Sequence, residues 1–187
     1  MFSSFKSLLF LSVVLISSSF QDVETGSIYM TKSGYIKFTS EAPLETIEAE
    51  NNNVSAVIDI SKKQLAFKVP ITSFLGFNSP LQQEHFNENY MEVDAYPQAT
   101  FTGKIIEDVD FNTNGTYKVR TKGMLNIHGS EKERIIAGMV KVNGDKITVT
   151  SNFDVPLSDH DISIPKIVNQ KIADIIQVEF KSDLVRK

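Results

Sequence analysis

Apolar side chains recur at every second position along most of the second half of this 187-residue chain. A period of two places alternate side chains on opposite faces of a strand, whereas a helix would repeat every three to four residues. The clearest run consists of Ile147, Val149, Phe153, Val155 and Leu157, which alternate with polar residues. The same alternation is found at 99–105, 117–127, 136–142 and 176–180. The pattern predicts a large antiparallel sheet with one apolar face.

Eight or nine strands, separated by turn residues, are expected in total. They are predicted near 35–39, 44–49, 54–60, 64–71, 98–107, 116–127, 134–142, 146–157 and 174–185. The polar run Glu48–Asn53 is interpreted as a loop between two of these strands. Asn143-Gly144 is the strongest hairpin signal, because both residues tolerate the positive φ of a type I′ turn. Asn114-Gly115 and His128-Gly129 are expected in looser loops.

An open sheet of this size would leave two unpaired edges, and closure into a barrel removes them. We therefore expect an all-β fold, an extended antiparallel barrel of about eight strands. The segment between Phe74 and Tyr96 lacks the period of two, and Ser79-Pro80-Leu81-Gln82 within it offers a capping serine followed by proline at the first helical position. One short helix is predicted near residues 80–90, over the mouth of the barrel. A second helical turn is predicted at 166–172.

The first twenty residues have the organisation of a secretory signal peptide. Lys6 precedes an apolar stretch at 7–16, which is followed by three serines. This stretch is shorter than the roughly twenty apolar residues that span a bilayer. We expect residues 1–20 to be removed and residues 21–187 to form a single domain of an exported protein, either periplasmic or secreted. The chain has no cysteine, so disulfides are excluded.

Composition argues against several classes of function. The net charge is −4 and the charges of both signs are mixed along the chain, so there is no basic stripe for nucleic acid. The three histidines, His85, His128 and His160, show no metal-ligand spacing, and a site built from two of them with Asp159 or Asp161 is the weaker alternative. No Gly-x-Ser-x-Gly elbow is present. We predict no catalytic residue, no metal and no cofactor.

The alternation also selects the side chains that face the barrel interior. An interior of this kind forms either an open lumen or a core filled by side chains, as in other eight-stranded barrels. A filled barrel would favour a structural module that binds a protein partner. In the open case His85, on the helix over the mouth, is the candidate for contact with the head group of a ligand. The predicted lumen residues are Phe67, Phe101, Val119, Leu125, Val140, Val149, Phe153, Ile176 and Val178.

Four blocks of the sequence together resemble the YceI-like family of exported bacterial, lipocalin-like proteins. They occur in the order that the family shows and cover most of the chain after residue 20. Two departures lie at the helix and in composition: Gln83-Glu84 stands where the family usually has Arg-Asp, and the chain has no tryptophan. The matching blocks are Glu84-His85-Phe86, Tyr96-Pro97-Gln98-Ala99-Thr100-Phe101, the segment from Gly123 to Gly129, and the segment from Phe153 to Asp159 with Ile162.

The resemblance implies an extended antiparallel barrel with a long apolar lumen that holds a polyisoprenoid chain, often in a homodimer. On this basis we expect non-catalytic binding, storage or transport of an isoprenoid or another long-chain lipid. The chain's thirteen phenylalanines suit a smooth apolar tube. The periodicity by itself predicts only the apolar face.

Overall fold

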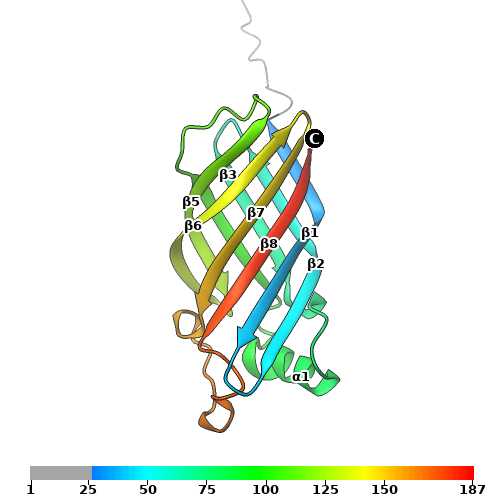
Figure 1. Cartoon of the computed structure of the whole chain (residues 1–187), viewed down its shortest axis with the longest axis vertical. Helices are drawn as coiled ribbons and strands as arrows, with labels where there is room; N and C mark the ends of the chain where they lie inside the picture. Colours follow the sequence, from blue (N-terminus) through cyan, green and yellow to red (C-terminus); the bar gives the residue numbers. More distant parts are fainter. Residues whose placement is uncertain (1–26) are drawn as a thin grey trace, which may run out of the picture.

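Eight antiparallel strands form one closed barrel in residues 27–187, the part of the chain that the computed structural model describes (Figure 1). The predicted all-β barrel is therefore confirmed, with eight strands. The signal peptide predicted for residues 1–20 lies outside the described residues. The strands are β1 (Ile28–Glu41), β2 (Thr46–Asp59), β3 (Gln64–Pro70), β4 (Gln98–Ile105), β5 (Gly115–Ile127), β6 (Ser130–Asn143), β7 (Lys146–Pro156) and β8 (Ile175–Arg186).

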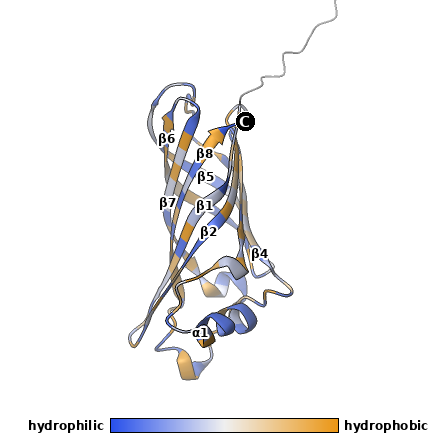
Figure 2. Ribbon diagram, turned by 90° about the vertical axis from the view of Figure 1, so that its right-hand side faces the viewer, coloured by the Kyte–Doolittle hydropathy of each residue, from blue (hydrophilic) through white to orange (hydrophobic). Residues whose placement is uncertain are grey.

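The strands follow one another around the barrel in sequence order, and β1 pairs with β8, so no strand edge is left free. Because every strand reverses direction, the connections alternate between two ends. One end holds the loops β2–β3, β4–β5 and β6–β7 together with the start of β1 and the end of β8. The other end holds the β1–β2 loop, the β5–β6 turn, the long β3–β4 connection with α1 (Pro80–His85), and the β7–β8 connection (Figures 1 and 2).

The helix forms where the sequence predicts it. Ser79 Oγ accepts a hydrogen bond from the Gln82 amide at 3.2 Å, and Pro80 occupies the first turn. Helix α1 passes directly into one π-helical turn, η2 (Phe86–Tyr90), so the helical segment ends at Tyr90 as predicted. Three short 3-10 turns complete the helical elements: η1 (Ile71–Ser73), η3 (Leu157–His160) and η4 (Lys166–Val168). The last occupies the start of the turn predicted at 166–172.

Strand β2 corrects the prediction of two short strands with a loop at Glu48–Asn53. The strand is continuous, and Asn51 takes an inward position in it with 1% of its surface exposed. Its Nδ2 donates to the Pro70 carbonyl at 2.8 Å and its Oδ1 accepts from the Asn53 amide at 2.8 Å. A buried polar residue with satisfied hydrogen bonds costs little. The apolar alternation is thus interrupted without interrupting the strand.

Strand β1 is also longer than the predicted strand at 35–39. Its pairing with β2 shifts register between Thr31 and Gly34 and again between Gly34 and Ile36. Each irregularity changes which residues face inward. The period of two therefore fails in the first half of this strand, which explains why the sequence predicts only its second half.

The two tight turns differ from the prediction in detail. The hairpin at Asn143 forms, but Asn143 pairs with Lys146, and of the two loop residues only Gly144 has a positive φ, at 58°. The predicted type I′ turn at Asn143-Gly144 is therefore wrong. Both residues of His128-Gly129 have positive φ, 52° and 74°, as a type I′ turn requires. A Cβ at position 129 would lie 2.4 Å from a ring carbon of Tyr96, which further favours glycine there.

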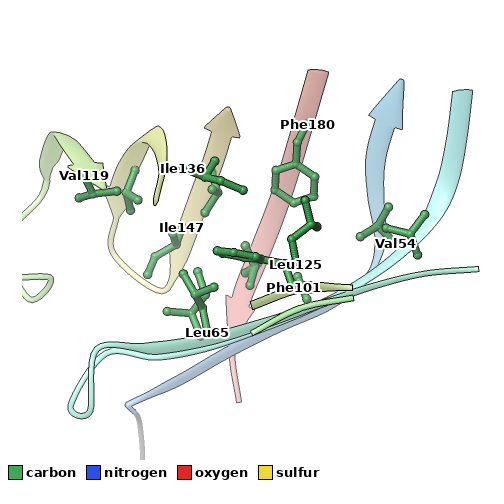
Figure 3. Packing of buried hydrophobic residues seen from close by; sticks show 14 of the residues in the cluster. Val54, Leu65, Phe101, Val119, Leu125, Ile136, Ile147 and Phe180 are labelled. Atoms are coloured by element: carbon green, nitrogen blue, oxygen red, sulfur yellow. The ribbon is translucent and has the colours of Figure 1, made fainter. Parts of the chain in front are cut away.

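Buried side chains fill the barrel at the end opposite α1. We call this end the closed end. Figure 3 shows buried apolar side chains that converge inside the barrel, Ile147 among them. The Tyr29 hydroxyl donates to the Gly144 carbonyl at 3.4 Å and accepts from Arg186, which fixes this ring beside the β6–β7 turn. Burial of each large apolar side chain contributes about 1.5–3 kcal/mol to stability. The side chains that fill the closed end are Tyr29, Phe111, Val142, Ile147 and Leu184, each at most 3% exposed.

Candidate functional site: an apolar cavity open at one end

A cavity of about 470 Å³ occupies the barrel between the closed end and α1. All eight strands contribute to its wall, and most of the side chains that line it are apolar. Ile58, Leu65 and Ile105 line it, whereas the five side chains that fill the closed end do not. The volume falls within the range of roughly 300–1,000 Å³ that is usual for small-molecule sites. The two alternatives for the interior are thus both present, a packed core at one end and a lumen at the other.

The nine predicted lumen residues all lie on the wall of this cavity. They come from the six strands β3 to β8, where the alternation of inward and outward side chains is regular. Strands β1 and β2 add Ile36, Phe38 and Ile47, which the predicted set omitted although they lie in the regular part of these strands. That any of these residues contacts a ligand stays a prediction.

Two phenylalanines meet across the lumen. The rings of Phe67 on β3 and Phe180 on β8 form an edge-on pair with their centroids 4.9 Å apart. Strands β1 and β2 separate these strands around the barrel, so the contact spans the interior. Phe101 pairs with Phe67 in register on β4. The cavity is therefore narrowed by aromatic rings between its two ends.

Four further phenylalanines gather where α1 covers the barrel. Phe38 stacks on Phe86 at 5.3 Å, and Phe74 and Phe77 each contact both of these rings at 5.1–5.9 Å. All four line the cavity. Three of them come from the β3–β4 connection, where no period of two exists to predict their orientation. The concentration of phenylalanine in a segment that is otherwise polar is the signal that could have identified them.

The cavity reaches solvent beside α1, at what we call the open end. Leu81, His85 and Lys171 line the cavity and are also exposed at the surface. Polar groups surround this opening: Glu45 accepts hydrogen bonds from Gln82 at 3.0 Å and from Asn78 at 3.2 Å. The helix therefore lies over the mouth, and His85 lies at the opening, where the prediction placed it.

Tyr90 brings one hydroxyl group to the lining near the helix. Burial raises the pKa of the Tyr90 hydroxyl, so this group stays protonated at neutral pH. A protonated phenol can donate one hydrogen bond and accept others. The lining near α1 thus offers a neutral polar contact in a mainly apolar surround.

Backbone pairing between β6 and β7 covers only part of the two strands. Residues Met139–Asn143 of β6 pair with Lys146–Thr150 of β7. Beyond these residues, toward the open end, side chains make the hydrogen bonds between the two strands. There Ser151 Oγ donates to the Ala137 carbonyl at 2.7 Å, and Arg134 donates to the Asp154 carbonyl at 2.7 Å. Ala137, Gly138 and Ser151 line the cavity at this point. Polar side chains thus complete the wall without presenting a charge to the lumen.

The other two histidines form a structural cluster beside the open end. His160 is fully buried in η3, and its Nδ1 contacts the Ser130 carbonyl at 3.0 Å. His128 contacts the His160 carbonyl through Nδ1 at 3.2 Å and Glu92 through Nε2 at 2.8 Å. These bonds join the β3–β4 connection, the β5–β6 turn and the β7–β8 connection. Both histidines hold the loops around the cavity and lie outside its lining.

Burial lowers the pKa of His160, and this predicts a pH dependence of stability. In the unfolded chain the imidazole gains a proton near its ordinary value of about 6.5, whereas the folded protein resists protonation. Protonation therefore favours unfolding, and stability should fall as the pH drops below about 6.5. In urea melts between pH 7.5 and 5.5 we expect a smaller decline for His160→Asn, whose amide can still bond to the Ser130 carbonyl. Equal declines for the two proteins would contradict this assignment.

Within residues 27–187 no group of three or more His, Cys, Asp or Glu side chains is placed to hold a metal ion. In the same residues no helix has the length and apolar character needed to cross a bilayer.

A closed antiparallel barrel of eight strands, packed at one end and hollow at the other, defines the class of lipocalin-like barrels with an apolar cavity. Residues 29–184 match the model of the YceI-like domain, which is most of the chain. The protein therefore belongs to the YceI-like domain family, as the sequence blocks predict. A search of curated proteins gave no match.

Solved structures share the fold at low sequence identity. A polyisoprenoid binding domain from Saccharophagus degradans, implicated in plant cell wall breakdown, superposes with a TM-score of 0.73 at 14% identity, covering 87% of this chain and 99% of that one. BcnA from Burkholderia cenocepacia gives a TM-score of 0.66 at 19% identity, covering 81% and 96%. The YCEI protein of Campylobacter jejuni gives 0.57 at 21% identity, covering 73% and 82%. At these identities the similarity establishes the barrel alone.

Proposed function

We propose that this protein binds a long apolar lipid chain, a polyisoprenoid or a similar molecule, and stores or carries it without chemical change. The observation that carries this proposal is the cavity itself, an apolar lumen sealed at one end and open at the other. A chain with one polar end fits that shape, with its tail toward the closed end and its head among the polar groups at the opening. The polyisoprenoid-binding domain that shares the fold supports the same choice of ligand.

The energetics of an apolar cavity favour a chain of several isoprene units. Burial of one five-carbon unit contributes roughly 3–4 kcal/mol, at about 0.8 kcal/mol for each methylene group. Micromolar affinity corresponds to about 8 kcal/mol, and association costs at least several kcal/mol beforehand. A few buried units therefore suffice. A compact polar molecule would gain little from these walls.

An exported carrier is the setting we propose for this activity, in the periplasm or outside the cell. Long isoprenoid chains are nearly insoluble in water, so their movement through an aqueous compartment requires a protein that covers them. The predicted signal peptide at residues 1–20 supports this location.

Organic extraction of the purified protein tests the proposal directly. The full chain is expressed in a bacterial host, purified without detergent, extracted with chloroform and methanol, and the extract is analysed by mass spectrometry. We expect an isoprenoid or another long-chain lipid in near-equimolar amount, and an intact protein mass that lacks about the first 20 residues. A protein that yields no lipid and takes up no added polyprenol would contradict the carrier function.

His85 is the proposed contact for the head group. Its side chain is exposed at the opening, so His85→Ala should change the free energy of unfolding by less than about 0.5 kcal/mol. Loss of one hydrogen bond to a ligand would weaken binding by roughly fivefold to tenfold. Both effects are measured by urea melts and by titration with a fluorescent polyprenol. Glu84→Ala is the matched control, because Glu84 lies one residue earlier on α1, is exposed and is absent from the lining. An unchanged affinity for His85→Ala would remove this residue from the site.

A further inference from the structure

Three exposed apolar side chains lie on separate segments around the opening of the cavity. They are Leu44 in the β1–β2 loop, Leu81 on α1 and Ile167 in η4, with 66%, 57% and 92% of their surfaces exposed. We call these residues the rim triad. Ile167 is the most exposed large apolar side chain in residues 27–187. Exposure of this degree costs free energy in water, so the presence of three such side chains around one opening requires an explanation.

Hydrogen bonds join the segments of the rim triad into one surface. The Leu44 amide donates to the Gln170 carbonyl at 2.9 Å, which links the β1–β2 loop to the segment after η4. Glu45 accepts from Gln82 at 3.0 Å, which links the same loop to α1. Leu81 also lines the cavity. The triad therefore surrounds the opening and is continuous with its lining.

Outside the triad, Leu75 alone among the large apolar side chains of residues 27–187 exceeds 60% exposure. Leu75, at 62% exposure, lies in the β3–β4 connection at the same end as the triad. The remaining exposed large apolar residues have exposures of 39–58%, and most lie on outer faces of strands, where Val57 and Val185 flank Met30 in register. The three most exposed large apolar side chains of residues 27–187, Ile167, Leu44 and Leu75, thus all lie at the open end.

Two lysines flank the most exposed member of the triad. Lys166 precedes Ile167 and Lys171 follows it in the same connection, and both are exposed. Neither takes part in an ion pair within residues 27–187. Apolar side chains beside free lysines match the interface of a bilayer, where acyl chains take up the former and anionic head groups attract the latter.

We infer that the open end docks on a phospholipid bilayer, with the rim triad inserted into the interface and Lys166 and Lys171 at the level of the head groups. This inference rests on the proposed carrier function, because it supplies the route by which a lipid reaches the cavity. A bilayer requires no matching shape from its partner, unlike a protein surface, and three apolar side chains on separate loops suit it. Docking in this orientation places the opening against the membrane. The lipid then enters the cavity without crossing water.

Sedimentation with phospholipid vesicles tests the inference. The protein, purified from cells that express the full chain, is mixed with vesicles of phosphatidylcholine, with and without phosphatidylglycerol. We expect the wild type to sediment with both, and more strongly with the anionic vesicles. Leu44→Asp combined with Ile167→Asp should reduce binding by about tenfold or more. Val185→Asp combined with Ile106→Asp is the control, because these residues are 57% and 46% exposed but lie at the closed end, on β8 and in the β4–β5 loop. This variant carries the same added charge and should bind as the wild type does.

The outcomes separate docking from lipid carriage. Equal vesicle binding by the rim variant and the control, with both proteins folded by circular dichroism, would overturn the inference. If the wild type yields lipid on extraction but does not sediment with vesicles, docking is refuted and the carrier function stands. A wild type that binds vesicles through the triad but never contains lipid would refute the carrier function alone. If light scattering shows a wild-type dimer that the rim substitutions dissociate, and no vesicle binding, the triad contacts a second copy and the inference is wrong.

Discussion

Replacement of Leu184 by alanine is expected to destabilise the protein by about 3–4 kcal/mol, whereas the same replacement at Leu125 should cost about 2 kcal/mol. Leu184 is fully buried and fills the closed end, so its removal leaves a new void. Leu125 is 6% exposed but borders the cavity. Its truncation enlarges a space that already exists, and only the transfer term is lost. Urea melts of lipid-free protein measure both values.

The two leucines form a matched pair because the substitution and the near-complete burial are the same. Delipidated protein is essential, since a bound chain that contacts Leu125 would add its own stabilisation. Equal losses of about 4 kcal/mol at both positions would show that the barrel is packed along its whole length. The carrier function would then have no room for its ligand.

Alternation predicted the residues of the cavity wall wherever the sheet is regular. Val119 and Leu125 on β5, or Val149 and Phe153 on β7, lie on one face because successive strand residues point to opposite sides. A barrel has only one inside, so the apolar face of each strand must turn toward it. The sequence alone could therefore identify cavity-lining residues on six of the eight strands, without knowledge of the order of the strands around the barrel.

Alternation could not predict the irregular parts of the first two strands or the fold of the long connections. In β2 the inward position of Asn51 depends on the Pro70 carbonyl, which comes from a different strand. The ring cluster of Phe38, Phe74, Phe77 and Phe86 depends on how the β3–β4 connection folds over the mouth. No local period encodes such contacts, since they are set by tertiary packing. Alternation was equally unable to show where the packed core ends and the lumen begins, because both present the same pattern.

The difference between the two ends lies in what enters the barrel. At the closed end Phe111, from the β4–β5 loop, is 3% exposed, packs edge-on against Tyr117 and belongs to the buried cluster that also holds Tyr29, Ile147 and Leu184. At the other end the residues that cover the opening come from α1, the β1–β2 loop and the β7–β8 connection, and they cover the space without filling it. A lumen with one opening follows from this asymmetry, and it fixes the direction in which a lipid would enter.

A charge inside this lumen is expected to abolish lipid binding, and Val149→Asp is the substitution that we predict to have the largest effect. Val149 lies on β7, is 8% exposed and lines the cavity. In the empty cavity water can solvate the carboxylate, but a bound apolar chain would remove that water. The cost of an unpaired buried polar or charged group is at least several kcal/mol, so affinity for a polyprenol should fall by about a hundredfold or more at pH 8.

Val149→Asn is the control, because the amide has the shape of the carboxylate without its charge and should weaken binding by only about tenfold. A bound lipid would raise the pKa of the new carboxyl group by desolvation, so binding should be coupled to proton uptake. Affinity of the aspartate variant should therefore recover as the pH is lowered from 8 to 5, while that of the asparagine variant should stay nearly constant. Titration of both variants with a fluorescent polyprenol measures this, with circular dichroism to confirm folding. Wild-type affinity in the folded aspartate variant at pH 8 would mean that the lipid binds elsewhere than in the barrel.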